Sequence, residues 1–191
     1  MYYRNLHLEV SETVYEPAED SFLLADNLLV RKGDKVLDVG TGSGIIALAA
    51  AEKAAHVIGV DVNPEAVACA RKNAKRNGIR NAEFRVSNLF ENVSGKFDAI
   101  AFNPPYLPGR SVKDEAVDGG AMGRALIEAF IKEVGGHLKP DGRIFLLASS
   151  LNEPAFIIKK FAGEGFRAQS VAEKKLFFEK LVILSAKRQI A

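Results

Sequence analysis

The sequence predicts an α/β fold with a doubly wound, mostly parallel sheet of seven strands and an antiparallel last strand. Short apolar runs alternate with longer stretches of helical character along the 191 residues,. The last two apolar runs are joined by a link too short for a crossover helix, so we expect these two strands to pair antiparallel. Hydrophobic content of 48% and charged content of 26% are ordinary for a globular chain,. The length fits one domain over residues 1–191,.

The sequence predicts seven strands and five helices that alternate along most of the chain. Strands are predicted at residues 35–39, 57–60, 82–86, 97–102, 142–148, 166–173 and 178–184, and helices at 17–29, 44–54, 64–77, 123–138 and 153–164. Runs of Val, Ile, Leu and Phe predict the strands, and longer mixed stretches of apolar and charged residues predict the helices. This alternation places helices on both faces of the sheet.

Local signals mark the ends of the helix at 64–77. Asn63-Pro64 puts a proline in its first turn, and Asn77-Gly78 ends it with a C-cap glycine,. In the first helix we interpret the apolar residues Phe22, Leu23, Leu28 and Leu29 as the face toward the core,.

Composition excludes several classes of function. With 26 Lys plus Arg against 24 Asp plus Glu, the net charge of +2 provides no strong field for capturing nucleic acid nonspecifically,. The single Cys69 excludes an internal disulfide and a multi-cysteine zinc cluster, and His7, His56 and His137 lack ligand spacing,. We expect Cys69 to be a buried thiol on a helix, and no metal site. No apolar stretch reaches the ~20 residues of a membrane span and no signal peptide is evident, so we expect a cytoplasmic protein,.

The most informative motif is Asn103-Pro104-Pro105-Tyr106, which follows the predicted buried strand at 97–102. The two prolines have no N–H and fixed φ angles, so the loop is stiff and its carbonyl oxygens have few local donors. The Asn103 side-chain oxygen and the Pro104 carbonyl can accept both hydrogens of one amide or exocyclic amine, and Tyr106 can stack on its plane. The motif therefore predicts a clamp for a planar NH2 group.

A glycine-rich turn, Asp38 to Gly44, connects a short apolar strand to the next helix. It departs from the dinucleotide fingerprint, because Ile45 holds the place of the third glycine. An acid just inside the strand end suits a ligand with a cationic amine, and a second acid, Asp61, ends the next strand, where acids commonly hold ribose hydroxyls. Together the two carboxylates describe a nucleoside with a positive amino-acid arm. S-adenosylmethionine fits that description.

Polar residues at the ends of successive strands should meet at one crevice, since ligands of open α/β sheets bind outside the carboxyl ends of the strands. These residues are Asp38, Asp61, Asn88 and Asn103. Asn88 can offer its amide to an adenine edge while Leu89 packs on the ring. The polar loop from Leu107 to Gly120 directly follows the clamp, and we interpret it as a substrate lid or wall.

At this point the chain resembles a known family, the release-factor glutamine methyltransferases, which are class I S-adenosylmethionine-dependent enzymes. The resemblance rests on Tyr15 to Ser21, Asp38 to Gly44, Asp61, Asn88 to Phe90, Asn103 to Tyr106 and Gly119 to Arg124. The glycine loop is shared with many methyltransferases, and the Asn-Pro-Pro-Tyr clamp with enzymes that methylate adenine or guanine amines. The Tyr15 to Ser21 motif is narrower, and it is similar to the compact archaeal and eukaryotic (HemK-like) branch. That branch lacks the amino-terminal helical domain of the bacterial enzymes.

The resemblance implies a Rossmann-like class I methyltransferase fold and methylation of the Gln side-chain amide in the Gly-Gly-Gln loop of a class 1 release factor. It assigns the clamp, Asn103, Pro104, Pro105 and Tyr106, to the glutamine. It assigns the cofactor to Ser21, Asp38, Gly40, Gly42, Gly44, Asp61, Val62, Asn88, Leu89 and Asn103. It also implies that residues 1–30 form an N-terminal segment and helix that cap the cofactor site.

Two features qualify the resemblance. The family usually has Asp where Asn88 stands, so we expect an altered adenine contact without loss of the site. Eukaryotic members require a small zinc-binding activator subunit along the edge strand that corresponds to residues 82–86. Whether this chain uses one is a hypothesis.

Two alternative functions remain open on the sequence. A nucleic-acid amino methyltransferase can use the same clamp on adenine or guanine, and it should show a basic surface or an added recognition domain. Neither is visible in the sequence, so nucleic acid is not the expected partner. A catalytically idle S-adenosylmethionine-binding protein is disfavoured because every clamp residue is present.

Overall fold

The computed structural model describes residues 1–105 and 124–189. Its elements are β1 (Tyr2–Tyr3), β2 (Leu6–His7), α1 (Glu19–Asn27), β3 (Lys35–Val39), α2 (Ile45–Ala51), β4 (His56–Asp61), α3 (Pro64–Arg76), β5 (Ala82–Val86), β6 (Phe97–Phe102), α4 (Ala125–His137), β7 (Leu138–Ser149), the 3-10 helix η2 (Ser150–Asn152), α5 (Pro154–Gly163), β8 (Phe166–Lys175) and β9 (Lys180–Arg188). All seven strands and all five helices expected from the sequence are present. Gly119 to Gly123 and the predicted loop from Leu107 to Gly120 lie outside the described residues.

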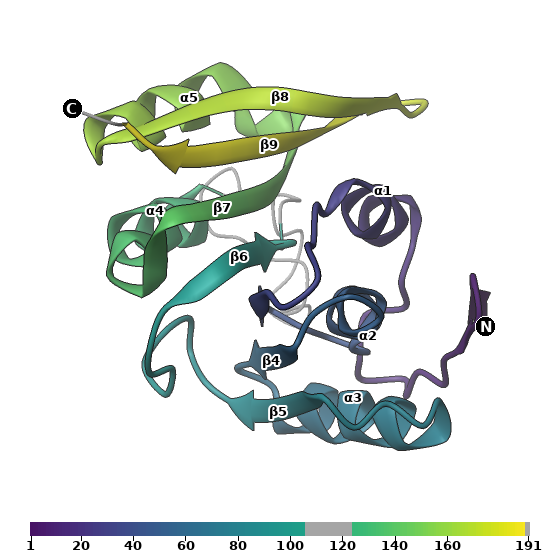
Figure 1. Cartoon of the computed structure of the whole chain (residues 1–191). Helices are drawn as coiled ribbons and strands as arrows, with labels where there is room; N and C mark the ends of the chain where they lie inside the picture. The colour runs from purple at the N-terminus through teal and green to yellow at the C-terminus, as the bar shows by residue number, and fades with distance from the viewer. Residues whose placement is uncertain (106–123, 190–191) are drawn as a thin grey trace.

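The central sheet has the strand order β5-β4-β3-β6-β7-β9-β8 (Figure 1). The pairs from β5 to β7 are parallel, and β9 is antiparallel to both of its neighbours, β7 and β8. The predicted mostly parallel sheet with an antiparallel last strand is therefore confirmed.

Helices cover both faces of the sheet. Along β3, Val36 packs into the core formed with α1, α2 and α3, whereas its neighbour Leu37 packs into the opposite core, formed with α4 and α5. This alternation follows from the period of two in a strand. Figure 1 shows the two groups of helices on opposite sides of the sheet. Both side chains are completely buried, as befits a parallel sheet covered on both faces,.

Some boundaries and faces differ from the sequence expectation. β7 begins at Leu138, before Gly142, and a two-stranded hairpin, β1–β2, precedes α1. In α1 the buried apolar residues are Leu24 and Ala25, and Leu29 lies beyond the helix with 54% of its surface exposed. The expected core face is confirmed except at Leu29. Leu28, just beyond the end of α1 at Asn27, still packs against the core, whereas Leu29 does not. Phe22 and Leu23 are partly buried against the core.

Other expectations are confirmed. Pro64 occupies the first turn of α3, and Gly78 follows its end with a positive φ of 67°. Cys69 is buried on α3, where its thiol donates to the Glu9 carbonyl. Within residues 1–105 and 124–189, no helix combines the length and apolarity needed to cross a bilayer.

Candidate functional site

The sheet register brings the predicted strand-end residues together. Val39, the last residue of β3, pairs with Val60 on one side and Phe102 on the other. Asp61 and Asn103 directly follow these two partners, so both lie at the carboxyl edge beside the glycine turn. Three of the four residues predicted to converge, Asp38, Asp61 and Asn103, therefore lie at neighbouring strand ends. The fourth, Asn88, follows β5, one strand farther along this edge.

The turn after β3 is built on positive φ angles. Gly42 has a φ of 55° and Gly44 a φ of 89°, a region that favours glycine,. A Cβ atom added at Gly44 would lie 3.0 Å from the Ala70 Cβ, so this glycine allows α2 to approach α3 closely. A Cβ atom at Gly42 would meet nothing within 4 Å. The backbone at Gly42 therefore faces open space in which a ligand can approach.

Asp38 is completely buried beneath this turn. Its Oδ2 accepts hydrogen bonds from the Thr41 hydroxyl at 2.7 Å and the Ala47 N–H at 3.2 Å. Its Oδ1 is buried with no hydrogen-bond partner among the described residues. Burial raises the pKa of Asp38 to about 7, against the lowering effect of the two hydrogen bonds. An unpartnered buried carboxylate oxygen is costly, and a cationic donor beside it would relieve that cost.

Asp61 links β4 to the glycine turn. Its Oδ2 accepts from the Gly42 N–H and its Oδ1 from the Asn63 N–H, each at 2.9 Å. Burial raises the pKa of Asp61, although these backbone N–H groups favour the ionised form. Each oxygen keeps a lone pair for a further donor, such as a ribose hydroxyl. The adjacent Val62 is 68% exposed, which leaves an apolar surface beside the carboxylate.

Asn88 and Leu89 follow β5, two strands away from β3. Asn88 is exposed, and its NH2 group donates to Glu91 at 3.0 Å, which leaves its side-chain oxygen as an acceptor. Leu89 is partly buried and has a φ of 44°, in the left-handed region that bulky residues rarely adopt,. The Ser87 hydroxyl donates to the Leu89 carbonyl at 3.0 Å and holds this turn.

Asn103 is held from the side by the first helix. Its NH2 group lies 3.2 Å from Asp20 Oδ2 and 3.4 Å from the Ser21 hydroxyl. Because the NH2 group faces these acceptors, Oδ1 is turned the other way, where it is buried with no partner among the described residues. Pro104 is buried and Pro105 is partly buried, whereas Tyr106 lies outside the described residues.

Asp20 is a residue that the sequence reasoning missed. Only 3% of its surface is exposed, and it accepts from the Tyr15 hydroxyl at 3.1 Å and from the Ser21 N–H at 2.6 Å. These bonds join three residues of the Tyr15 to Ser21 motif to Asn103. The signal was available, since Asp20 stands inside that motif, but its contact crosses 83 residues of sequence.

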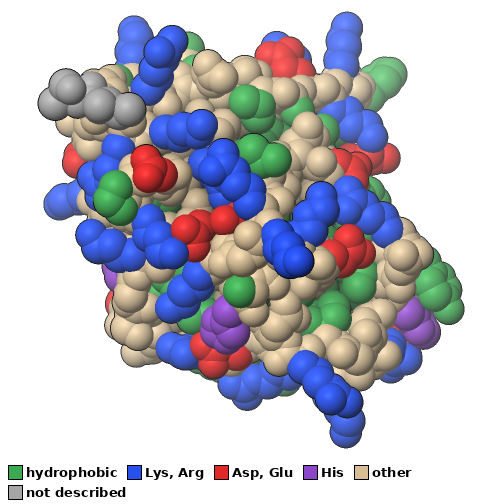
Figure 2. Space-filling view, in the orientation of Figure 1, with side chains coloured by type: hydrophobic (Ala, Val, Ile, Leu, Met, Phe, Trp, Pro, Cys, Tyr) green, Lys and Arg blue, Asp and Glu red, His purple; other side chains and the backbone are tan. Residues whose placement is uncertain are grey.

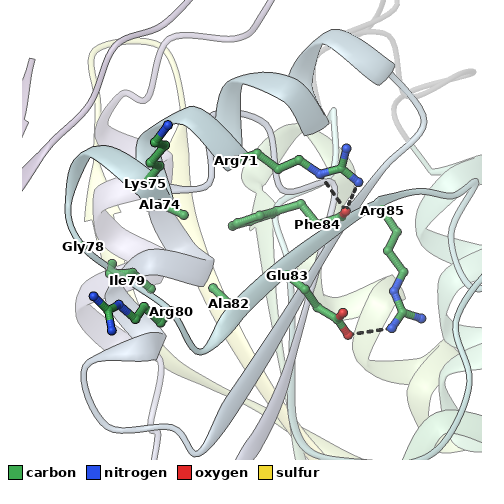
Figure 3. Close-up of a pocket in the computed structure, with 10 residues that line it drawn as sticks. All are labelled: Arg71, Ala74, Lys75, Gly78, Ile79, Arg80, Ala82, Glu83, Phe84 and Arg85. Carbon is green, nitrogen blue, oxygen red and sulfur yellow. Dashed lines mark hydrogen bonds and ion pairs between the residues drawn. The ribbon is translucent and has the colours of Figure 1, made fainter.

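A separate hollow of about 740 Å³ lies at the β5 edge of the sheet, between β5 and α3 (Figure 3). Arg71 crosses it and donates to the Phe84 carbonyl at 2.6 Å, and Arg85 pairs with Glu83 at 2.6 Å. Lys75 and Arg80 also line it, so basic groups predominate. None of the predicted site residues lines this hollow. Among the described residues, no group of His, Cys, Asp and Glu could hold a metal ion.

Comparisons with known proteins show the family and the fold of this chain. The family model of the methyltransferase small domain matches residues 16–178. A Methanocaldococcus jannaschii protein assigned as a protein N5-glutamine methyltransferase is 44% identical over 96% of both chains. A release factor glutamine methyltransferase from Aliivibrio fischeri is 38% identical over 75% of this chain and 54% of its own length. The E. cuniculi Mtq2–Trm112 structure, described as responsible for methylating the termination factor eRF1, shares the fold with a TM-score of 0.76 and 24% identity, over 93% of this chain and 99% of that one.

Proposed function

This chain belongs to the methyltransferase small domain family and, within it, to the protein N5-glutamine methyltransferases, and we propose a release factor as its substrate. The reaction transfers a methyl group from S-adenosylmethionine to the side-chain amide nitrogen of the Gln in the Gly-Gly-Gln loop of a class 1 release factor. Translation takes place in the cytoplasm, so we also infer that the chain acts there.

The observation that supports this proposal best is the buried side-chain oxygen of Asn103, which has no hydrogen-bond partner among the residues that the structure describes. Asp20 and Ser21 accept hydrogen bonds from the NH2 group of Asn103, so the side-chain oxygen of Asn103 faces away from α1. The next residue, Pro104, has no backbone N–H and offers its carbonyl oxygen as a second acceptor. Two neighbouring acceptors can take the two hydrogens of a primary amide, and a substrate amide would satisfy the side-chain oxygen of Asn103.

The residues of the strand-end crevice fit S-adenosylmethionine. Asp38 Oδ1 would receive its ammonium group, Asp61 its ribose hydroxyls, and Asn88 with Leu89 its adenine, while the open space at Gly42 accommodates the ligand. When bound, the cofactor supplies an electrophilic methyl group on sulfur. Residues 1–30 would cap this site, which the contact of Asp20 and Ser21 with Asn103 supports.

The chain's own contribution to the chemistry is positioning and electrostatics. An amide nitrogen is a poor nucleophile because its lone pair is delocalised, so both N–H groups must be held and the lone pair must point at the methyl donor. Such alignment can supply about 7–11 kcal/mol of barrier reduction. Asn103 and Pro104 accept both hydrogens and thereby stabilise the positive charge that develops on nitrogen. We assign no general base, since the proton can leave to water after transfer.

The test is methyl transfer from labelled S-adenosylmethionine in three parallel reactions, with a purified class 1 release factor, bulk DNA and bulk RNA. We expect label on the factor alone. Label on nucleic acid alone would overturn the proposal in favour of an adenine or guanine amine. On the face drawn in Figure 2, Lys and Arg side chains gather across the middle with Asp and Glu among them. The near balance of 26 Lys and Arg against 24 Asp and Glu over the whole chain does not favour nucleic acid as the partner,.

We also propose that the β5 edge receives a small zinc-binding activator subunit. β5 ends the sheet, so its outer backbone groups can pair with a further strand, apart from the Phe84 carbonyl that Arg71 occupies, and the basic hollow beside it suits an acidic segment,. Co-expression with such a subunit should raise the yield of folded chain and the affinity for S-adenosylmethionine. High yield and full activity of the chain alone would contradict this assignment.

A further inference from the structure

The hairpin between β8 and β9 ends in two exposed phenylalanines. Phe177 has 91% and Phe178 89% of its surface exposed, and their rings pack edge to face with centroids 4.6 Å apart. The Leu176 N–H donates to the Glu179 carbonyl at 2.8 Å, so the two phenylalanines are the central residues of a tight turn. The folded chain gains almost no burial from either ring. The fold itself therefore does not explain these side chains.

This turn lies at the same edge of the sheet as the clamp. β8 is antiparallel to β9, which is antiparallel to β7, so β8 runs in the same direction as the parallel strands and ends at their carboxyl edge. Figure 1 shows the hairpin projecting past the sheet over α1. Lys174 at the end of β8 forms an ion pair with Glu19, the residue before Asp20. The exposed rings therefore lie near α1, the helix that contacts Asn103.

A second link runs from the turn to the clamp through Tyr15. Glu179 accepts a hydrogen bond from the Ser149 hydroxyl, which anchors the hairpin to the end of β7. Burial raises the pKa of Tyr15, and the carboxylates of Asp20 and Glu179 raise it further. Glu179 therefore lies within electrostatic reach of Tyr15, whose hydroxyl bonds Asp20.

The hairpin is also rigid enough to act as a contact. Leu176, directly before the rings, packs against the core, and β8 and β9 pair continuously from Ala172–Ile183 to Lys175–Lys180. Charged side chains surround the turn: Glu173, Lys174, Lys175, Glu179 and Lys180. Aromatic anchors with a charged rim are the typical anatomy of a protein interface, and a paired backbone beneath them reduces the entropy lost on binding.

We propose that Phe177 and Phe178 dock the folded domain that presents the acceptor glutamine to the clamp. This inference rests on the proposed function. A clamp for one amide cannot by itself select one glutamine among all those on protein surfaces, so selection requires contacts outside it. An apolar surface beside the Gly-Gly-Gln loop of the release factor is the expected counterpart. β5 lies at the opposite end of the strand order, so an activator on that edge would leave the hairpin free.

The test compares two substrates for the double variant Phe177→Ser/Phe178→Ser: the intact release factor and a short peptide containing Gly-Gly-Gln. We expect the KM for the intact factor to rise about tenfold or more, as for loss of an aromatic hot spot, with kcat unchanged. Both constants for the peptide should stay at the wild-type value. Val171→Ser is the matched control, because Val171 is a 44% exposed apolar side chain on β8 of the same hairpin, away from the turn, and it should change neither substrate's constants.

Three results would overturn the docking role. They are an unchanged KM for the intact factor, an equal loss on factor and peptide, and a wild-type dimer that the double variant converts to a monomer. If wild-type enzyme methylated neither substrate, the proposed function would fail on its own. Direct calorimetric binding of the factor to wild-type and variant chains would then decide the docking role, which requires weaker binding by the variant.

Discussion

At the scale of single residues, the clamp depends on Asp20, a buried side chain of α1. Asp20 holds the NH2 group of Asn103 and is itself held by Tyr15 and Ser21. An amide can rotate by a half turn with little steric change, and only its hydrogen-bond partners decide which end faces the substrate. Asp20 is therefore a positioning residue.

Replacing Asp20 by Ala should lower kcat by about two orders of magnitude, in the range expected for a misplaced reacting group. S-adenosylmethionine affinity should change much less, because Asp20 contacts the clamp. The matched control is Asp26→Ala, which removes an acid from the same helix where it bonds Tyr3 and Arg4 and should leave kcat unchanged. Equal losses of kcat and cofactor affinity in the Asp20 variant would show that it builds the cofactor pocket instead.

Asp38 predicts a pH dependence of cofactor affinity. Its pKa is raised to about 7 in the unliganded chain, so the carboxyl group is mostly protonated below that pH. A cationic ammonium group prefers the ionised form, so affinity should increase as the pH rises from about 6 to 7 and level off above. Calorimetric titrations should show this rise in wild-type chain. In Asp38→Asn the affinity should be weaker and nearly flat with pH, and an unchanged slope would contradict the role of Asp38.

The raised pKa of Asp38 also makes folding stability depend on pH. Stability of the unliganded chain falls as the pH rises, whereas cofactor affinity increases. The folded-state pKa lies above the unfolded value of about 3.9, so the folded chain binds the proton more tightly. The contribution of Asp38 to stability is therefore largest below about pH 4 and is lost as pH rises toward 7. The melting temperature of the unliganded Asp38→Asn variant should fall less than that of wild type over this interval.

At the scale of elements, β4 is packed at Gly59 too closely for any side chain. A Cβ atom there would lie 2.5 Å from the Phe84 ring and 2.7 Å from the Thr41 hydroxyl. Gly59→Ala should therefore destabilise the fold by about 1–3 kcal/mol, the usual cost of overpacking. In Gly136→Ala, where a Cβ atom meets nothing within 4 Å inside α4, stability should rise by about 0.5–1 kcal/mol,. Denaturant unfolding would measure the unfolding free energy of both variants. Equal changes in the two variants would contradict the close packing at Gly59.

The elements were largely predictable, because parallel strands and amphipathic helices leave periodic patterns in sequence. β3, β5 and β6 begin and end where the pattern places them. β7 starts earlier, at Leu138, which pairs with Phe97 ahead of a shift in the β6 register. The following Lys139, Pro140 and Asp141 interrupt the apolar pattern that marks the strand in sequence. The β1–β2 hairpin has two residues in each strand, too few to show any period.

The site was predictable as far as strand ends determine it. Asp38, Asp61 and Asn103 could be brought together because neighbouring parallel strands end at one edge. The hydrogen bond from Asn103 to Asp20 could not be predicted in this way, since it depends on how α1 packs across that edge. The position of the exposed rings of β8–β9 likewise follows from the strand order, which a local pattern does not encode.

At the scale of the whole molecule, one buried ion pair joins distant parts of the sheet. Arg143 of β7 is 2% exposed and pairs with Asp34, which precedes β3. Asp34→Ala would leave a buried guanidinium without its counter-ion and should cost about 3–5 kcal/mol of unfolding free energy. The exposed Lys160–Glu128 pair is the control, and Glu128→Ala should cost about 1 kcal/mol or less,. Equal costs in chemical denaturation would show that the buried pair has no special role.

The central claim is that the Asn103 clamp delivers a methyl group to one glutamine amide. The most direct measurement is mass spectrometry of the Gly-Gly-Gln peptide from a purified release factor after reaction with wild-type or Asn103→Ala chain and S-adenosylmethionine. We expect the wild type to methylate the glutamine side chain, and Asn103→Ala to do so orders of magnitude more slowly while still binding cofactor. An unmodified glutamine with the wild type, or equal rates for the two chains, would contradict the claim.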